Sequence, residues 1–240
     1  MIIDTHTHLD GSEFKDDIQE VVQRAKSAGV SKVFIPAIDL SSIKSINTVC
    51  QQFPDFAYPM MGLHPEEVKA NYKEVLQKMK NELLANSKYI AVGEVGLDFY
   101  WSREFEKEQL EAFEEQVKWS VETRLPLMIH CRKAQNEMVK ILRKYQKQLP
   151  GGVFHCFTGN EKEAAELLSF NNFVLGIGGV LTFKKANLPE TLKSVPLQRI
   201  VLETDSPYMA PVPLRGKRNE SSFLVHVVAK LAEVYNTTKM

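Results

Sequence analysis

Short apolar segments alternate with amphipathic segments along the whole chain, with a spacing of about 30 residues. The apolar segments are rich in β-branched residues and lack a polar alternation, which is typical of parallel strands covered on both faces. The segments between them carry apolar residues three and four positions apart, as helices do. Eight such units predict an α/β fold, and the best match is a single-domain (β/α)8 TIM-like barrel, whose usual size is about 250 residues. A doubly wound open sheet is the alternative, because periodicity alone does not separate the two.

The expected elements follow each other in strict alternation. Strands are expected at residues 1–10, 33–37, 56–61, 89–93, 125–129, 152–154, 173–177 and 199–202. Helices are expected at residues 15–28, 43–52, 72–86, 103–123, 134–149, 161–170, 186–194 and 222–235. The chain shows no linker, low-complexity tract or break in composition, so we expect one domain over residues 1–240.

Composition restricts the partners and the compartment. Lys and Arg together number 30, as do Asp and Glu, so net charge gives no argument for a long polyanionic partner. Met1 begins the first expected strand, which leaves no room for a signal peptide, and no apolar run approaches the about 20 residues of a membrane span. The three cysteines, an odd number, are expected to be free thiols. These features favour a cytoplasmic monomer.

The first strand carries His6 and His8, which are two residues apart. Side chains alternate across a strand, so both imidazoles should leave on the same side. Further polar residues fall at the ends of later expected strands. Together with the first pair, the residues at strand ends are His6, His8, His64, Glu94, His130, His155 and Asp205. In a barrel, the carboxyl ends of all strands meet around one mouth, where active sites of this fold lie.

The residue types of this set indicate a metal site. Four imidazoles and two carboxylates suit borderline or hard divalent ions such as Mg²⁺, Mn²⁺ or Zn²⁺, without choosing among them. Six ligands suit two ions about 3.5–4 Å apart that share a carboxylate. We expect Glu94 to be the shared ligand. The remaining ligands would be His6, His8 and Asp205 for one ion, and His130 and His155 for the other.

Single members of the set have simpler interpretations. A lone histidine at a strand end is usually a hydrogen-bonded structural residue, so the argument depends on the coordinated placement of the whole set. Cys131 and Cys156 each follow an expected ligand, which suggests zinc thiolates. The neighbour of an inward-facing strand residue points outward, so we expect both to be small buried side chains.

Six longer motifs contain these residues. They are DTHTHLD at 4–10, GLHP at 62–65, GEVGLDFY at 93–100, HCRKA at 130–134, HCFTG at 155–159 and LETDSPYMAPVPLRGKRN at 202–219. In sequence and in chain order, they resemble the TatD family of metal-dependent deoxyribonucleases, within the amidohydrolase-like barrel enzymes. The resemblance covers nearly the whole chain.

The resemblance implies a TIM-like barrel, a two-metal site and hydrolysis of DNA phosphodiester bonds, often from a 3′ end. By motif position, it implies substrate contact by His64 and metal ligation by His6, His8, Glu94, His130, His155 and Asp205. The chain differs from the family in having Cys131 where Ser is common and Ser221 where Pro is usual. It also ends at Met240, where the family continues into one more helix. We therefore expect that the C-terminal helix is truncated or that the final helical cover of the barrel is missing.

Catalytic roles are expected for Glu94 and Asp205, with Asp205 accepting the proton of the attacking water. His64 and Arg132 are candidates for holding phosphoryl oxygens. Phe99, Tyr100 and Trp101 are candidates for stacking on exposed bases, and packing under the loop is the alternative for Phe99. The Pro-rich loop offers further substrate contacts, namely Arg215, Arg218 and Asn219. Pairing of these loop residues with acidic neighbours is the simpler interpretation.

The near-zero net charge favours a single strand or a frayed 3′ end over a long duplex. The sequence therefore predicts a metal-dependent deoxyribonuclease, acting as a 3′–5′ exonuclease on such DNA. The alternative is an amidohydrolase-type hydrolase of another substrate, such as an aminoacyl-tRNA deacylase or a small-molecule ester or amide hydrolase. A non-enzymatic metal-binding protein is a weaker third interpretation, because no part of the site is missing.

Overall fold

The computed structural model describes residues 1–238, in which strands and helices alternate eight times. The strands are β1 (Ile2–Asp4), β2 (Val30–Pro36), β3 (Ala57–Met60), β4 (Val92–Asp98), β5 (Leu127–Arg132), β6 (Gly152–Phe154), β7 (Phe173–Ile177) and β8 (Ile200–Leu202). The α-helices are α1 (Ile18–Ser27), α2 (Ser42–Gln52), α3 (Tyr72–Ala85), α4 (Glu106–Thr123), α5 (Gln135–Tyr145), α6 (Glu161–Leu167), α7 (Leu188–Leu192) and α8 (Leu224–Val234). The predicted alternation is confirmed.

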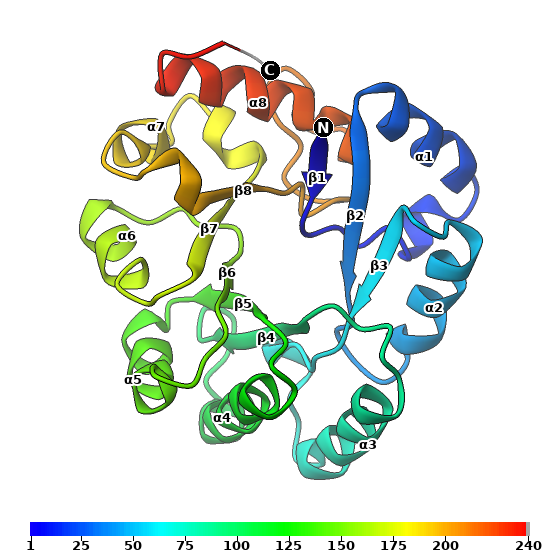
Figure 1. The fold of residues 1–240 in the computed structure, drawn as a ribbon, viewed down its shortest axis with the longest axis vertical. Helices are drawn as coiled ribbons and strands as arrows, with labels where there is room; N and C mark the ends of the chain where they lie inside the picture. Colours follow the sequence, from blue (N-terminus) through cyan, green and yellow to red (C-terminus); the bar gives the residue numbers. More distant parts are fainter. Residues whose placement is uncertain (239–240) are drawn as a thin grey trace.

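The strands form two parallel sheets, with the orders β1-β2-β3 and β4-β5-β6-β7-β8. Isolated parallel bridges join the sheets at both seams, between Thr7 and Ser206 and between Met61 and Val92. At the second seam, the amide of Gly93 also donates to the carbonyl of Met61 at 2.9 Å. Figure 1 shows the result, a ring of strands inside a ring of helices. The fold is the predicted (β/α)8 TIM-like barrel, and the open-sheet alternative is wrong.

The fourth and fifth strands lie further along the chain than the predicted ranges 89–93 and 125–129. Glu94 and His130 therefore lie within strands and not beyond their ends, which corrects the prediction. Pairing continues this far because Gly96 lets the two backbones approach. A Cβ atom at Gly96 would lie 1.8 Å from the carbonyl oxygen of His130, and the φ angle of +148° also favours glycine.

Helices cover the outside of the ring with their apolar sides facing inward. In α4, Phe113 and Val117 are one turn apart, and both are fully buried.

Some helices are shorter than predicted at their ends. α1 begins at residue 18 because a 3₁₀ turn at Ser12–Phe14 precedes it. α5 ends at Tyr145, whose carbonyl accepts hydrogen bonds from the amides of the turn that follows.

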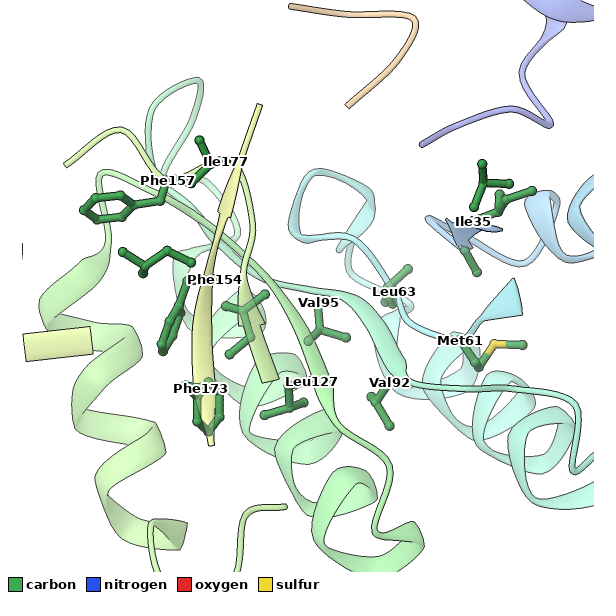
Figure 2. Close-up of a cluster of buried hydrophobic side chains, with 14 of the residues drawn as sticks. Ile35, Met61, Leu63, Val92, Val95, Leu127, Phe154, Phe157, Phe173 and Ile177 are labelled. Carbon is green, nitrogen blue, oxygen red and sulfur yellow. The ribbon is translucent and has the colours of Figure 1, made fainter. Parts of the chain in front are cut away.

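The apolar core fills the space between the strands and the helices. Figure 2 shows Val92, Val95 and Leu127 on neighbouring strands, with Phe154 and Phe173 beside them. The two phenylalanine rings are stacked with their centroids 5.0 Å apart. Each fully buried side chain of this size stabilises the fold by about 1.5–3 kcal/mol. This layer fixes the strands from which the polar side chains project.

Three further predictions concern the cysteines, membrane-spanning segments and the end of the chain. Cys50, Cys131 and Cys156 are free thiols, as expected, and burial raises the pKa of each to about 12. Among residues 1–238, no helix is long and apolar enough to cross a membrane. The predicted truncation concerns the chain end, where residues 239–240 lie outside the described part.

Candidate metal centre

The seam between β1 and β8 carries three of the expected ligands. His6 and His8 leave the chain on the same side after β1, with their ring centroids 5.1 Å apart. Asp205 follows β8, and its amide donates to the carbonyl of His6 at 2.9 Å. Its Oδ1 atom lies 3.6 Å from His8 Nε2 and 3.8 Å from His6 Nε2. Two segments far apart in the sequence thus converge on one point.

Glu94 lies at the centre of the cluster and is only 2% exposed. Its Oε2 atom faces the first strand and lies 3.2 Å from His6 Nε2. Its Oε1 atom faces three other imidazole nitrogens: His155 Nε2 at 2.9 Å, His130 Nδ1 at 3.1 Å and His64 Nε2 at 3.4 Å. One carboxylate therefore presents one oxygen to each of two groups of histidines.

The spacing of the donor atoms fits divalent ions. Two ligand atoms about 2.1 Å from one ion at a tetrahedral angle lie about 3.4 Å apart. The imidazole-to-carboxylate separations here range from 2.9 to 3.9 Å. Three groups have donor atoms within 4.8 Å of one another: His6, His8 and Asp205; His6, Glu94 and His155; and His64, Glu94 and His130. Within residues 1–238 no cysteine joins these groups, so the donors are nitrogen and oxygen only.

Burial and neighbouring charges set the protonation of the cluster. Burial opposes ionisation of Glu94, but charge on His6 and His155 outweighs it and holds the pKa of Glu94 well below its usual range. Burial also disfavours a charged His155, yet Glu94 and Glu203 raise its pKa well above the ordinary value. Burial lowers the pKa of His6. An anionic carboxylate thus lies among imidazoles, where a bound cation would replace protons.

Asp98, to which the sequence analysis gave no role, supports one of these imidazoles from behind. Its Oδ2 atom accepts a hydrogen bond from His130 Nε2 at 2.9 Å, so the Nδ1 atom of that ring faces Glu94. A carboxylate behind a ligating histidine fixes the orientation of the ring. Glu94 and Asp98 are four residues apart on β4, so their side chains point to the same side, and this spacing is a sequence signal for the role of Asp98. The signal could be used only if the strand was known to extend to Asp98.

Glu203 is a second acid that the sequence analysis did not assign. It is fully buried, and its Oε1 atom accepts the amide hydrogen of Cys156 at 2.5 Å. The same oxygen lies 3.6 Å from His155 Nδ1. Glu203 and Asp205 both follow β8, two residues apart, and this spacing is the only sequence signal for the role of Glu203.

His64 lies inside the cluster. It caps the 3₁₀ turn at Pro65–Glu67, where its Nδ1 atom accepts the amide hydrogen of Glu66 at 3.2 Å. This contact turns Nε2 toward Glu94. His64, which is predicted to contact substrate, therefore lies at the same range of distances from the Glu94 carboxylate as the expected ligands His6 and His8.

Two of the predicted substrate-binding arginines are exposed and stacked on aromatic rings. Arg132 ends β5, with its guanidinium carbon 3.7 Å from the ring centroid of Tyr100. Arg215, in the loop after β8, lies 3.7 Å from the ring centroid of Phe183. Arg132 also lines a cavity of about 950 Å³ that reaches the metal cluster at His155.

The other two predicted contacts in the loop after β8 are structural. Arg218 forms a two-pronged ion pair with Asp17, at 2.8 and 2.7 Å. Asn219 is fully buried, and its side-chain amide donates to the carbonyls of Thr204 and Tyr208. Both side chains thus have partners within the protein, and their contact with substrate stays a prediction. Pairing with an acidic neighbour is the interpretation that fits Arg218.

Comparison with known proteins agrees with this geometry. A family model described as TatD related DNase matches residues 3–240. YabD of Bacillus subtilis, named as an uncharacterized metal-dependent hydrolase, is 37% identical over 239 residues, which cover 99% of this chain and 92% of that protein. The 3′-5′ ssDNA/RNA exonuclease TatD of Pectobacterium atrosepticum is 32% identical over 238 residues, covering 97% and 91%.

A solved structure is similar over the same length. The crystal structure of YJJV, a TatD homolog from Escherichia coli K12, superposes with a TM-score of 0.89 at 29% identity. The match covers 97% of this chain and 90% of that chain. The similarity in fold thus extends over nearly the whole of both chains.

Proposed function

The chain belongs to the TatD-related DNase family and is a metal-dependent hydrolase, and we propose that it removes nucleotides from the 3′ end of single-stranded or frayed DNA. We further propose that two divalent ions bind in the cluster around Glu94. One named relative acts on single-stranded DNA and RNA, so RNA belongs to the same substrate class.

The position of Glu94 carries the proposal. Its two oxygens face different histidines, His6 on one side and His155 on the other, at 3.2 and 2.9 Å. A carboxylate that serves two ions needs this arrangement, because each ion takes one oxygen. Burial of Glu94 among imidazoles also keeps water from competing for either oxygen.

The other residues would bind, orient and accept a proton. When bound, divalent ions would generate a nucleophile from water near neutral pH and neutralise charge on the phosphoryl oxygens. Burial raises the pKa of Asp205, but the neighbouring His8 outweighs this and keeps it below the usual value. The side chain of Asp205 is 18% exposed, so it is partly open to solvent, and its ionised carboxylate would accept the proton of the attacking water. Arg132 and Arg215 would hold the substrate's phosphates at the mouth.

The first experiment compares substrates and metals. Metal-stripped protein would be reloaded with Mg²⁺, Mn²⁺ or Zn²⁺ and given 3′-labelled single-stranded DNA, blunt duplex DNA, single-stranded RNA and aminoacyl-tRNA. We expect hydrolysis of the single strands from the 3′ end and slow attack on the duplex. A preference for aminoacyl-tRNA, or equal rates on duplex and single strand, would contradict the proposal.

A matched pair of variants tests the central residue. Glu94→Gln should lower kcat by at least about a thousandfold, since it removes a charge that acts on the reacting groups. Glu104→Gln, at an exposed position, is the control and should keep the full rate. Circular dichroism should show folded protein in both cases. The unmodified protein should contain two metal ions per chain. A content of one ion per chain would overturn the proposal of two ions and leave the proposed nuclease activity standing.

A further inference from the structure

Two exposed aromatic side chains lie beside the metal centre, immediately after β4. Tyr100 is 50% exposed and Trp101 is 68% exposed, with their ring centroids 4.8 Å apart in an edge-to-face arrangement. Phe99, the residue before them, is only 6% exposed and packs beneath the loop. Large aromatic side chains gain free energy when they are buried, so two adjacent exposed ones next to an active site favour a ligand-binding role.

Arg132 holds this pair of rings. Its guanidinium carbon lies 3.7 Å from the ring centroid of Tyr100 and 5.2 Å from that of Trp101. Contacts of a guanidinium with aromatic faces are attractive and restrict the motion of all three groups. We name these three residues, Tyr100, Trp101 and Arg132, the aromatic platform. It joins the loop after β4 to the end of β5.

One carboxylate fixes the platform relative to the metal centre. The Oδ1 atom of Asp98 accepts the amide hydrogen of Tyr100 at 2.9 Å, and its Oδ2 atom accepts from His130 Nε2, also at 2.9 Å. Asp98 is 2% exposed, so solvent does not compete for these bonds. The platform and one of the metal-facing imidazoles are therefore positioned by the same side chain.

A cavity runs from two members of the platform, Tyr100 and Arg132, to the cluster. It has a volume of about 950 Å³, and Tyr100, Arg132 and His155 are part of its wall. Lys133 and Lys162 bring positive charge to the same wall, and Glu137, Glu163 and Glu166 bring negative charge. Cavities that bind small molecules measure about 300–1,000 Å³, so there is room for a nucleotide. Exposed aromatic faces, on which bases stack, are a feature with which proteins bind single strands irrespective of sequence.

We propose that the aromatic platform is a nucleobase-binding subsite. It would stack on an unpaired base of the strand whose phosphate lies at the metal centre, a placement that rests on the proposed function. A base inside a duplex has both faces covered and its edge paired, so it cannot reach the platform. The platform would thereby make the enzyme select single strands.

Tryptophan fluorescence tests the subsite without relying on hydrolysis. The chain has two tryptophans, and Trp119 is fully buried, so a change on ligand binding reports Trp101. The probe would be a phosphorothioate oligothymidylate added to the metal-loaded protein, with an abasic strand of the same backbone as the comparison. We expect quenching by the oligothymidylate only, and about 5- to 150-fold tighter binding than that of the abasic strand. Equal affinity, or emission that does not change, would overturn the subsite.

Variants test the same point through the reaction. Trp101→Leu and Tyr100→Leu should each reduce the preference for base-containing over abasic strands toward one, mainly through KM. Leu84→Ala, at an exposed apolar position on α3, is the control and should keep the preference. An unchanged preference in both platform variants would contradict the subsite.

The two proposals fail in different ways. Hydrolysis of DNA without base-dependent quenching would reject the subsite and leave the nuclease proposal standing. Base-dependent quenching without hydrolysis of DNA or RNA would reject the nuclease proposal and retain a subsite for bases.

Discussion

The carboxylate of Asp98 accepts a hydrogen bond from His130 Nε2 at 2.9 Å, which leaves the Nδ1 atom of that ring facing the metal cluster. Asp98 is also held at its backbone, where its amide donates to Gln109 Oε1 on α4 at 2.9 Å. The tautomer of His130 is thus set by a residue outside the candidate metal-binding groups.

Replacing Asp98 should therefore weaken metal binding. In Asp98→Asn, one neutral oxygen must accept from both the Tyr100 amide and His130 Nε2. The neutral side chain also no longer raises the basicity of the His130 ring, so we expect metal affinity to fall about 10- to 100-fold. Competition with a chelator of known affinity measures this. Asp55→Asn, in an exposed turn, is the control. Equal affinity in both variants would show that His130 needs no support.

The stability of the protein should depend on the ionisation of Asp4. This carboxyl is fully buried at the end of β1, and burial raises its pKa from 3.8 to about 7 although Ser221 and Thr204 donate to it. Between these values the folded state holds a proton that the unfolded state has lost. The free energy of unfolding should then fall as pH rises, by up to about 1.4 kcal/mol per pH unit.

Comparison with Asp4→Asn isolates this contribution, because the amide cannot ionise. Urea unfolding at several pH values from 4 to 7 should show a shallower decline in the variant than in the unmodified protein. Identical slopes would mean that Asp4 is ionised in the folded state throughout this range.

Arg218 and Asn219 should contribute to stability and not to substrate affinity. Arg218→Met breaks the ion pair with Asp17 and should cost about 1 kcal/mol, because the pair is partly exposed. Asn219→Ala leaves buried carbonyls without donors and should cost at least about 2 kcal/mol. Chemical denaturation measures both values. The KM for single-stranded DNA should stay constant in Arg218→Met but rise in Arg215→Met, and the reverse pattern would restore Arg218 as a contact.

Removal of the metal should lower the melting temperature. A ligand that binds only the folded state, at a hundred times its dissociation constant, stabilises a protein by about 2.7 kcal/mol. The effect should shrink as pH falls, since the imidazoles must lose protons to bind a cation and the pKa of His155 is raised. Differential scanning fluorimetry with and without chelator measures the shift. A melting temperature that does not respond to chelator would show that the centre adds nothing to stability.

The strand-and-helix order, and the gathering of the candidate ligands in one place, could be predicted from the sequence because both depend on local patterns. Apolar periodicity gives the order of the elements, and chemistry-bearing residues at strand ends indicate the mouth of a barrel. The end of β4 was not predictable in this way, since it depends on the close approach of Gly96 to His130 in a neighbouring strand. The role of Asp98 was missed for the same reason.

The loop after β8 shows a second limit. Arg215 and Arg218 are three residues apart in one polar segment, and nothing in the segment separates them. Their roles differ because Asp17 lies opposite one and Phe183 opposite the other, and both partners come from distant parts of the chain. Long-range partners of this kind require coordinates.

The two sheets of the barrel each contribute to the candidate ligand set. His6 and His8 follow β1, in the sheet of β1, β2 and β3, while the remaining expected ligands lie in or follow strands of the other sheet. An ion bound across them would be a cross-link between two halves that otherwise meet through isolated bridges and backbone hydrogen bonds at the seams. Opening of either seam would separate the ligands, so a bound ion would make the barrel harder to open.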